Sequence, residues 1–120
     1  MALMAVVFPI LPGKTGEWRE FIADLNGPRS SEFKRSREEA GVHERTFLQS
    51  TPMGDLVIVT LEGDDPAGAY GLMSSDKSPF GTWFRERAEA LHGVDLTATP
   101  MVGSPSELVA DTDRVATPVG

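Results

Sequence analysis

Two histidines are the side chains of this chain best suited to acid–base chemistry near neutral pH. His92 ends an apolar helical stretch and directly precedes Gly93. Its imidazole could act as an acid or base, could ligate haem, or could interact with the unpaired carbonyl groups of the last helical turn. We favour the last role, because no motif ties a carboxylate, serine or cysteine partner to His92.

The second histidine alternates with other polar and aromatic side chains along a predicted strand. This alternation places four residues on one face: His43, Arg45, Phe47 and Gln49. If that face lines a cavity in a dimer, His43 is a candidate base and Arg45 a candidate ligand-binding residue. If the face meets solvent, all four are ordinary surface residues. The sequence leaves both alternatives open.

Two aromatic side chains are further candidates, Tyr70 as a catalytic residue and Trp83 as a ligand-binding residue. Tyr70 is the only tyrosine, and a tyrosine can assist the oxygenation of a bound phenol without a cofactor. Gly68 and Gly71 would let a ligand approach it, but they favour a short or irregular helix instead. Trp83 lies on an apolar helical stripe, so we expect core packing, and Trp83→Ala should lower the free energy of unfolding by around 3–5 kcal/mol.

Arg37 belongs to the one basic cluster of the chain, together with Arg29, Lys34 and Arg35. Such a cluster could bind the carboxylate or phosphate of a small substrate, which makes Arg37 a candidate ligand-binding residue. Glutamates are interleaved at positions 32, 38 and 39. This interleaving favours a solvated helix with local ion pairs.

The composition excludes several classes of function. The 120 residues suit a single domain, for which we expect residues 1–112, followed by a flexible tail at 113–120. A formal net charge of −7 repels nucleic acid and anionic membranes, so neither is an expected partner. The absence of cysteine excludes disulfides, thiolate metal sites and a cysteine nucleophile, and it is compatible with the cytoplasmic location that we expect.

Two other segments call for structural interpretations. Asp64 and Asp65 resemble a metal-binding pair, but one is needed as a helix cap, and no spaced set of histidines and carboxylates completes a site. We therefore expect no metal. The apolar run at residues 2–11 has no preceding basic residue and is interrupted by Pro9, so it predicts a buried strand rather than a signal peptide.

The predicted elements follow the order strand, two helices, two strands, two helices, strand. Strands are expected at residues 3–11, 42–50, 55–62 and 107–111. Helices are expected around residues 18–25, 30–40, 66–73 and 80–91. Ser30 or Ser31 should cap the second helix, while Asp65 and Ser78 should cap the third and fourth. This order is typical of an α+β ferredoxin-like sandwich, with helices on one face of an antiparallel sheet.

The first and third predicted strands are apolar on both faces, along residues 3–8 and 56–61. Helices cover only one face of such a sheet, so the other face must meet a second apolar surface. Two sheets packed face to face in a two-fold homodimer satisfy this need most simply, and they would form a dimeric α/β barrel. Pro9 cannot donate to a ladder, so it indicates an edge strand or a bulge.

Short motifs of recognisable type are spread along the chain. They are Pro12-Gly13-Lys14 with Trp18, Gly41-Val42-His43-Glu44 to Leu48-Gln49, Thr51-Pro52-Met53-Gly54-Asp55, Leu56 to Glu62, Asp64-Asp65-Pro66, and Ser78 through Trp83 and His92 to Leu96. Together they resemble a family of short, uncharacterised bacterial proteins within the dimeric α/β barrel superfamily, over residues 3 to about 111. That superfamily includes antibiotic-biosynthesis and haem-degrading monooxygenases, and the resemblance implies their fold and dimeric assembly.

Haem-degrading members of this superfamily place a tryptophan and a haem-ligating histidine near the second main helix, and an asparagine on the first strand. Trp83 and His92 have a similar spacing here, but the only asparagine is Asn26, at a helix end. We therefore expect no cofactor and no tight binding of haem.

Two functional hypotheses follow. In the first, a small, mostly apolar or phenolic molecule binds between helices and sheet, as in a cofactor-free monooxygenase, where His92 or His43 removes a proton and an arginine holds the anion. In the second, the protein is a non-enzymatic structural or regulatory dimer, and its apolar sheet face serves only assembly. A subunit cavity of roughly 300 Å³ or more with converging polar groups favours the first hypothesis, and a solidly packed interior favours the second.

Overall fold

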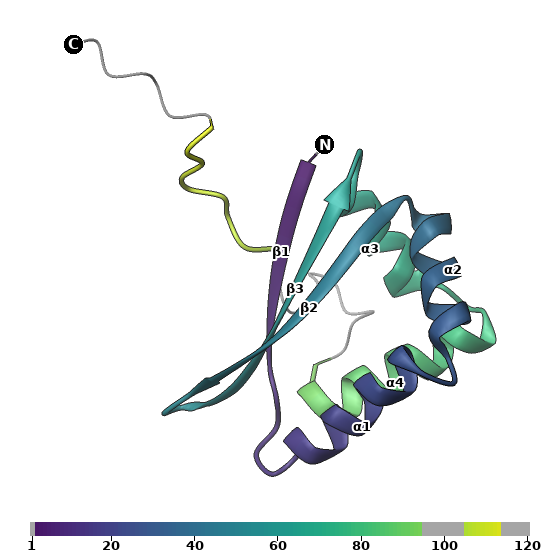
Figure 1. The fold of residues 1–120 in the computed structure, drawn as a ribbon, viewed down its shortest axis with the longest axis vertical. Helices are drawn as coiled ribbons and strands as arrows, with labels where there is room; N and C mark the ends of the chain where they lie inside the picture. The colour runs from purple at the N-terminus through teal and green to yellow at the C-terminus, as the bar shows by residue number, and fades with distance from the viewer. Residues whose placement is uncertain (1, 95–104, 114–120) are drawn as a thin grey trace.

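A computed structural model of the protein describes residues 2–94 and 105–113. Within this part of the chain the elements follow the predicted order (Figure 1). They are β1 (Ala2–Pro9), α1 (Thr15–Asn26), α2 (Ser30–Ala40), β2 (Val42–Thr51), β3 (Gly54–Gly63), α3 (Pro66–Ser75) and α4 (Pro79–His92). The predicted tail from 114 onward lies outside the described residues.

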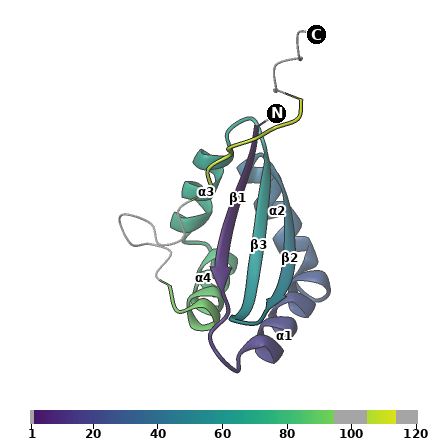
Figure 2. The ribbon, with the colours of Figure 1, turned by 90° about the vertical axis from the view of Figure 1, so that its left-hand side faces the viewer.

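The strands form an antiparallel sheet in the order β1-β3-β2, so β3 is central among the described strands. All four helices lie on one side of this sheet (Figure 1). Figure 2, turned by 90° from Figure 1, looks onto the other face of the sheet, with the strands in front of the helices. This arrangement confirms the α+β prediction and is compatible with a ferredoxin-like sandwich.

The alternation along each strand decides which side chains enter the core. On β1 the side chains of Met4, Val6 and Phe8 are buried, while Leu3 and Val7 are exposed on the other face. Pro9 ends this strand in regular register opposite Leu56, so the edge position and not a bulge accommodates it. The inner face therefore packs under the helices, and the outer face keeps its own apolar side chains.

Local signals at the helix ends are mostly confirmed. Asp65 and Ser78 accept hydrogen bonds from backbone N–H groups of α3 and α4, as their cap-then-proline sequences predict. Gly41 and Gly93 end α2 and α4 with φ of 76° and 67°, the left-handed conformation that favours glycine. The serine cap predicted for α2 is wrong, because Arg29 occupies that position and makes no side-chain cap hydrogen bond.

Two other predictions are corrected. Residues 107–111 do not form a strand: they are irregular, and residues 105–110 are exposed, so they lack the buried face that a strand needs. The segment contacts the sheet through a hydrogen bond from Ser106 N–H to the carbonyl of Ala5. Of the two forms predicted for the helix around residues 66–73, short or irregular, the second is wrong, since α3 is an α-helix of 10 residues despite Gly68 and Gly71.

No helix in the described part of the chain combines the length and the apolar character needed to cross a bilayer. The helices instead place their apolar sides against the inner sheet face. Two adjoining clusters of buried side chains form this core, one around β1, β3 and α3, and the other around α1, β3 and α4.

Candidate functional site

A cavity of about 80 Å³ lies between the inner face of the sheet and the helices. Each of the seven elements contributes at least one residue to its lining. Most of the lining is apolar, and Phe8, Trp18, Phe21 and Phe84 supply aromatic rings. Polar side chains interrupt this apolar surface at several points, among them Arg37, Glu44, Thr46, Tyr70, Arg85 and His92. The cavity is therefore the place where the described structure brings reactive side chains together.

His92 is buried in this lining, and its predicted role at the helix end is wrong. Its Nδ1 lies 2.8 Å from the carbonyl oxygen of Pro9, which can only accept a hydrogen bond. The backbone N–H of Gly93 already caps α4 by donating to Glu89, so the imidazole is free to turn toward β1. The contact with Pro9 assigns the proton to Nδ1 and leaves Nε2 as the basic nitrogen.

The surroundings of His92 favour its neutral form. Burial lowers the pKa of its imidazole, and the hydrogen bond with Pro9 opposes this effect to a smaller extent. The ring of Phe8 lies 5.3 Å away, measured between ring centroids. Nε2 has no hydrogen-bond partner among the described residues, so the imidazole keeps one unpartnered basic nitrogen.

Tyr70 lines the same cavity from α3, and its side chain is only 7% exposed. Its hydroxyl group is buried without a hydrogen-bond partner among the described residues. Burial raises the pKa of this phenol, so Tyr70 stays protonated and able to donate. Gly68 and Gly71 are both exposed, and neither lines the cavity.

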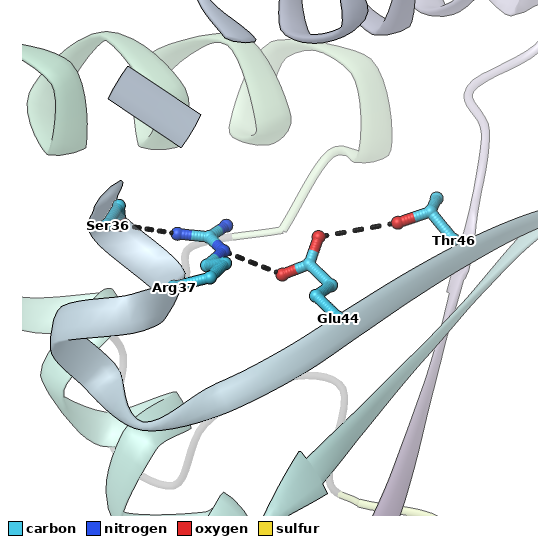
Figure 3. Close-up of polar contacts among 4 residues, drawn as sticks. All are labelled: Ser36, Arg37, Glu44 and Thr46. Carbon is cyan, nitrogen blue, oxygen red and sulfur yellow. Dashed lines mark hydrogen bonds and ion pairs between the residues drawn. The ribbon is translucent and has the colours of Figure 1, made fainter. Parts of the chain in front are cut away.

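Arg37 and Glu44 form a buried ion pair at the cavity wall (Figure 3). Nε of Arg37 donates to Oε1 of Glu44 at 2.8 Å, and Nη1 donates to the hydroxyl of Ser36 at 2.8 Å. The second oxygen of Glu44 accepts a hydrogen bond from Thr46 at 3.4 Å. The remaining nitrogen of Arg37, Nη2, is buried and has no partner among the described residues.

The solvated helix predicted for the basic cluster is wrong at Arg37 and confirmed at Arg29, which forms a local ion pair with Glu32. Arg37 turns inward because its guanidinium packs on the ring of Phe84 at 4.7 Å and meets the carboxylate of Glu44. Sequence reasoning missed Glu44. The signal was present, since alternation places this carboxylate on the same face as buried Val42, where a charge needs a partner.

The other predicted site residues lie elsewhere. His43 and Arg45 alternate with the inner-face residues of β2 and belong to the outer face, where Arg45 lies 3.5 Å from Glu62. Neither residue lines the inner cavity. Trp83 does not line it either: its ring is partly exposed and packs against Phe21, with the guanidinium of Arg29 at 4.0 Å.

The cavity offers little to a metal or to haem. Among the described residues no group of three or more histidines and carboxylates could hold a metal ion. The Nδ1 of His92 is held by Pro9 and its Nε2 is unpartnered among the described residues, but the haem macrocycle greatly exceeds a cavity of about 80 Å³. The expectation that haem does not bind tightly stays a prediction, and the size of the cavity now supports it.

No family model, curated protein or solved structure matches this chain. The resemblance to the dimeric α/β barrels therefore stays a prediction from the sequence motifs.

Proposed function

We propose that this protein binds a small, mostly apolar molecule with one polar group in the cavity between the sheet and the helices. One observation carries the proposal. Two polar atoms of residues in a mostly apolar wall, the hydroxyl of Tyr70 and Nη2 of Arg37, are buried and unpartnered among the described residues. Buried polar groups in native proteins nearly always have a partner, and a ligand in the cavity would supply one.

The size of the cavity limits the ligand. Its volume of about 80 Å³ is well below the roughly 300 Å³ of an ordinary ligand pocket, and volume alone favours the packed interior of the second hypothesis. Met73 offers room for growth, because it lines both this cavity and a groove of about 600 Å³ bordered by α2, α3 and the start of α4. Methionine is flexible, so its rotation could admit a longer molecule.

The chemistry that suits this cavity is proton abstraction from a bound phenol. His92 would accept the proton at Nε2, while Tyr70 and Arg37 would donate hydrogen bonds to the phenolate that forms. His43 has no part in this proposal, because it lies on the outer face. Oxygenation of such a phenolate by dioxygen stays a prediction from the family resemblance.

Binding is best tested by NMR titration with phenol, using the indole N–H signal of Trp18 as the reporter, because this ring lines the cavity. We expect a saturable shift of Trp18 and Tyr70 signals. The indole signal of Trp83, which lies outside the lining, is the internal control and should move less. A titration that shifts only outer-face residues such as His43, or none at all, would contradict the proposal.

A second candidate function, a structural or regulatory homodimer, is favoured by the outer face of the sheet. The pairing register aligns Val7, Ile58 and Phe47 in one apolar row across the three strands. Phe47 is 51% exposed and Val7 39%. Such a row is typical of an assembly surface, and we propose that two copies pack through it as a dimeric α/β barrel. This assembly is compatible with ligand binding on the inner face.

A further inference from the structure

The two unpartnered polar atoms of the cavity lining can both donate hydrogen bonds. Nη2 of Arg37 is a donor only, and the hydroxyl of Tyr70 is a donor and an acceptor. Each of these residues is 7% exposed, so bulk water does not satisfy them. A ligand that completes this wall must therefore bring an acceptor oxygen.

The charged groups of the lining set the charge that the ligand should carry. They are Arg37, Arg85 and Glu44. Glu44 has both oxygens engaged, by Arg37 and by Thr46, and Arg85 donates to the backbone carbonyl of Asp76, which carries no charge. Burial holds His92 toward its neutral form and Tyr70 toward its protonated form. The lining thus has one positive charge in excess, inside a chain whose net charge is −7.

We propose that the ligand is a small organic monoanion, a phenolate or a monocarboxylate, whose oxygen accepts hydrogen bonds from Arg37 Nη2 and Tyr70 Oη. This inference rests on the proposed function and deepens it by naming the ligand class. A single negative charge balances the excess of the lining, and the apolar wall covers the body of the ligand. Amines would meet two arginines without a free carboxylate, so the cavity rejects them.

The test compares probes of similar shape and different charge by NMR, with Trp18 as the reporter. Butyrate, butyramide and butylamine form one series, and 4-nitrophenolate with nitrobenzene forms the other, so that carboxylates and phenolates are distinguished. We expect saturable shifts with at least one anion, at a Kd roughly tenfold or more below that of its neutral counterpart. The amine should cause no shift.

Two variants assign the effect to the named atoms. Tyr70→Phe removes only the hydroxyl. We expect it to weaken the binding of anions several-fold, to weaken the binding of the neutral probes less, and not to lower the unfolding midpoint. Arg37→Met combined with Glu44→Met removes the ion pair as a unit and keeps the net charge of the lining, because Arg85 remains. It removes the donor Nη2, so we expect the preference for anions to fall several-fold. Arg45→Met changes an arginine on the outer face and serves as the matched control, with binding unchanged.

The outcomes separate this inference from the proposed function. If neutral probes shift Trp18 at the same concentrations as the anions, the ligand class is wrong and the binding function survives. If no probe shifts Trp18 saturably, both fail. If Tyr70→Phe does not fold, the double variant at Arg37 and Glu44 decides, and unchanged anion preference in it would overturn the inference.

Discussion

At the scale of single residues, the imidazole of His92 makes one hydrogen bond to the described residues, from Nδ1 to the carbonyl of Pro9. Its pKa is lowered by burial, so the unfolded chain binds this proton first as the pH falls. The contribution of His92 to stability is complete above the ordinary histidine pKa of about 6.5 and is lost as the pH drops below it.

We therefore predict that the free energy of unfolding decreases on acidification below about pH 6.5, and that His92→Gln reduces this dependence. Urea unfolding at a series of pH values measures it. His43→Gln, on the outer face, is the matched control and should leave the decrease in the free energy of unfolding on acidification as it is in the wild type. An identical pH dependence in wild type and His92→Gln would show that the imidazole is not buried as described.

The ion pair of Arg37 and Glu44 is the second feature at this scale, with side chains 8% and 5% exposed. Removing one partner strands a buried charge, so Arg37→Met should lower the free energy of unfolding by about 3–5 kcal/mol. Adding Glu44→Leu removes the stranded charge and should restore most of the loss. Denaturant unfolding of the two single variants and the double variant measures the coupling, and a double variant as unstable as Arg37→Met would contradict it.

At the scale of elements, Trp83 joins α4 to α1. Its ring contacts Phe21 at 5.4 Å and Phe80 at 5.9 Å between centroids, and Arg29 covers it. The role in core packing agrees with the sequence prediction, but the ring is partly exposed, so Trp83→Ala leaves less buried space than predicted.

We expect Trp83→Ala to lower the free energy of unfolding by about 3 kcal/mol, at the low end of the range for tryptophan truncation. Denaturant unfolding measures the change. Leu91, in the same helix, is only 2% exposed. For each buried carbon atom removed, Leu91→Ala should lower the free energy of unfolding by at least as much as Trp83→Ala. A loss below about 1 kcal/mol would mean that the ring makes no tertiary contact of consequence.

Helix α3 offers a matched pair of glycines. A Cβ at Gly71 would meet no atom within 4 Å, whereas a Cβ at Gly68 would meet the carboxylate of Asp65. That carboxylate caps the helix by accepting a hydrogen bond from the N–H of Gly68, with 3.0 Å between nitrogen and Oδ1. Gly71→Ala should stabilise the protein by about 0.5–1 kcal/mol through helix propensity. Gly68→Ala should lose that gain and part of the cap, which is itself worth about 1 kcal/mol. Thermal unfolding of both variants compares them, and equal stabilisation would contradict the cap.

At the scale of the whole molecule, the outer sheet face predicts the assembly. The described helices all lie behind the sheet in Figure 2, so the apolar row of Val7, Ile58 and Phe47 has no helix over it. Burial of such a row between two copies follows the ordinary packing of sheet on sheet. The apolar area of this row is buried only when the dimer forms, so the stability that its burial adds depends on protein concentration.

We predict that the 13.0 kDa chain sediments as a dimer at micromolar concentration, and that Phe47→Asp converts it to a monomer. Sedimentation velocity measures both masses. Met53→Asp changes a side chain that is 99% exposed in the β2–β3 turn and should leave the dimer intact. A wild-type monomer at this concentration would count against the dimeric barrel.

The sequence by itself determined the features that depend on neighbouring residues. Alternation gave the two faces of β1, apolar stripes gave α1 and α4, and the caps at Asp65 and Ser78 follow from side chains within three residues of the N–H groups that they bind. Each of these signals depends only on residues that are close together in the chain. The strand predicted at residues 107–111 failed because no buried face supports it.

Tertiary structure alone decided the candidate site. The hydrogen bond of His92 joins residues 83 positions apart in the chain, and no local periodicity encodes such a pairing. The sequence favoured a helix-end role for His92, because no motif ties a partner to it, and a solvated helix for Arg37, because glutamates are interleaved with the basic residues. The fold instead turns them toward β1 and Glu44, because packing the helices on the inner sheet face excludes the water that would otherwise solvate both side chains.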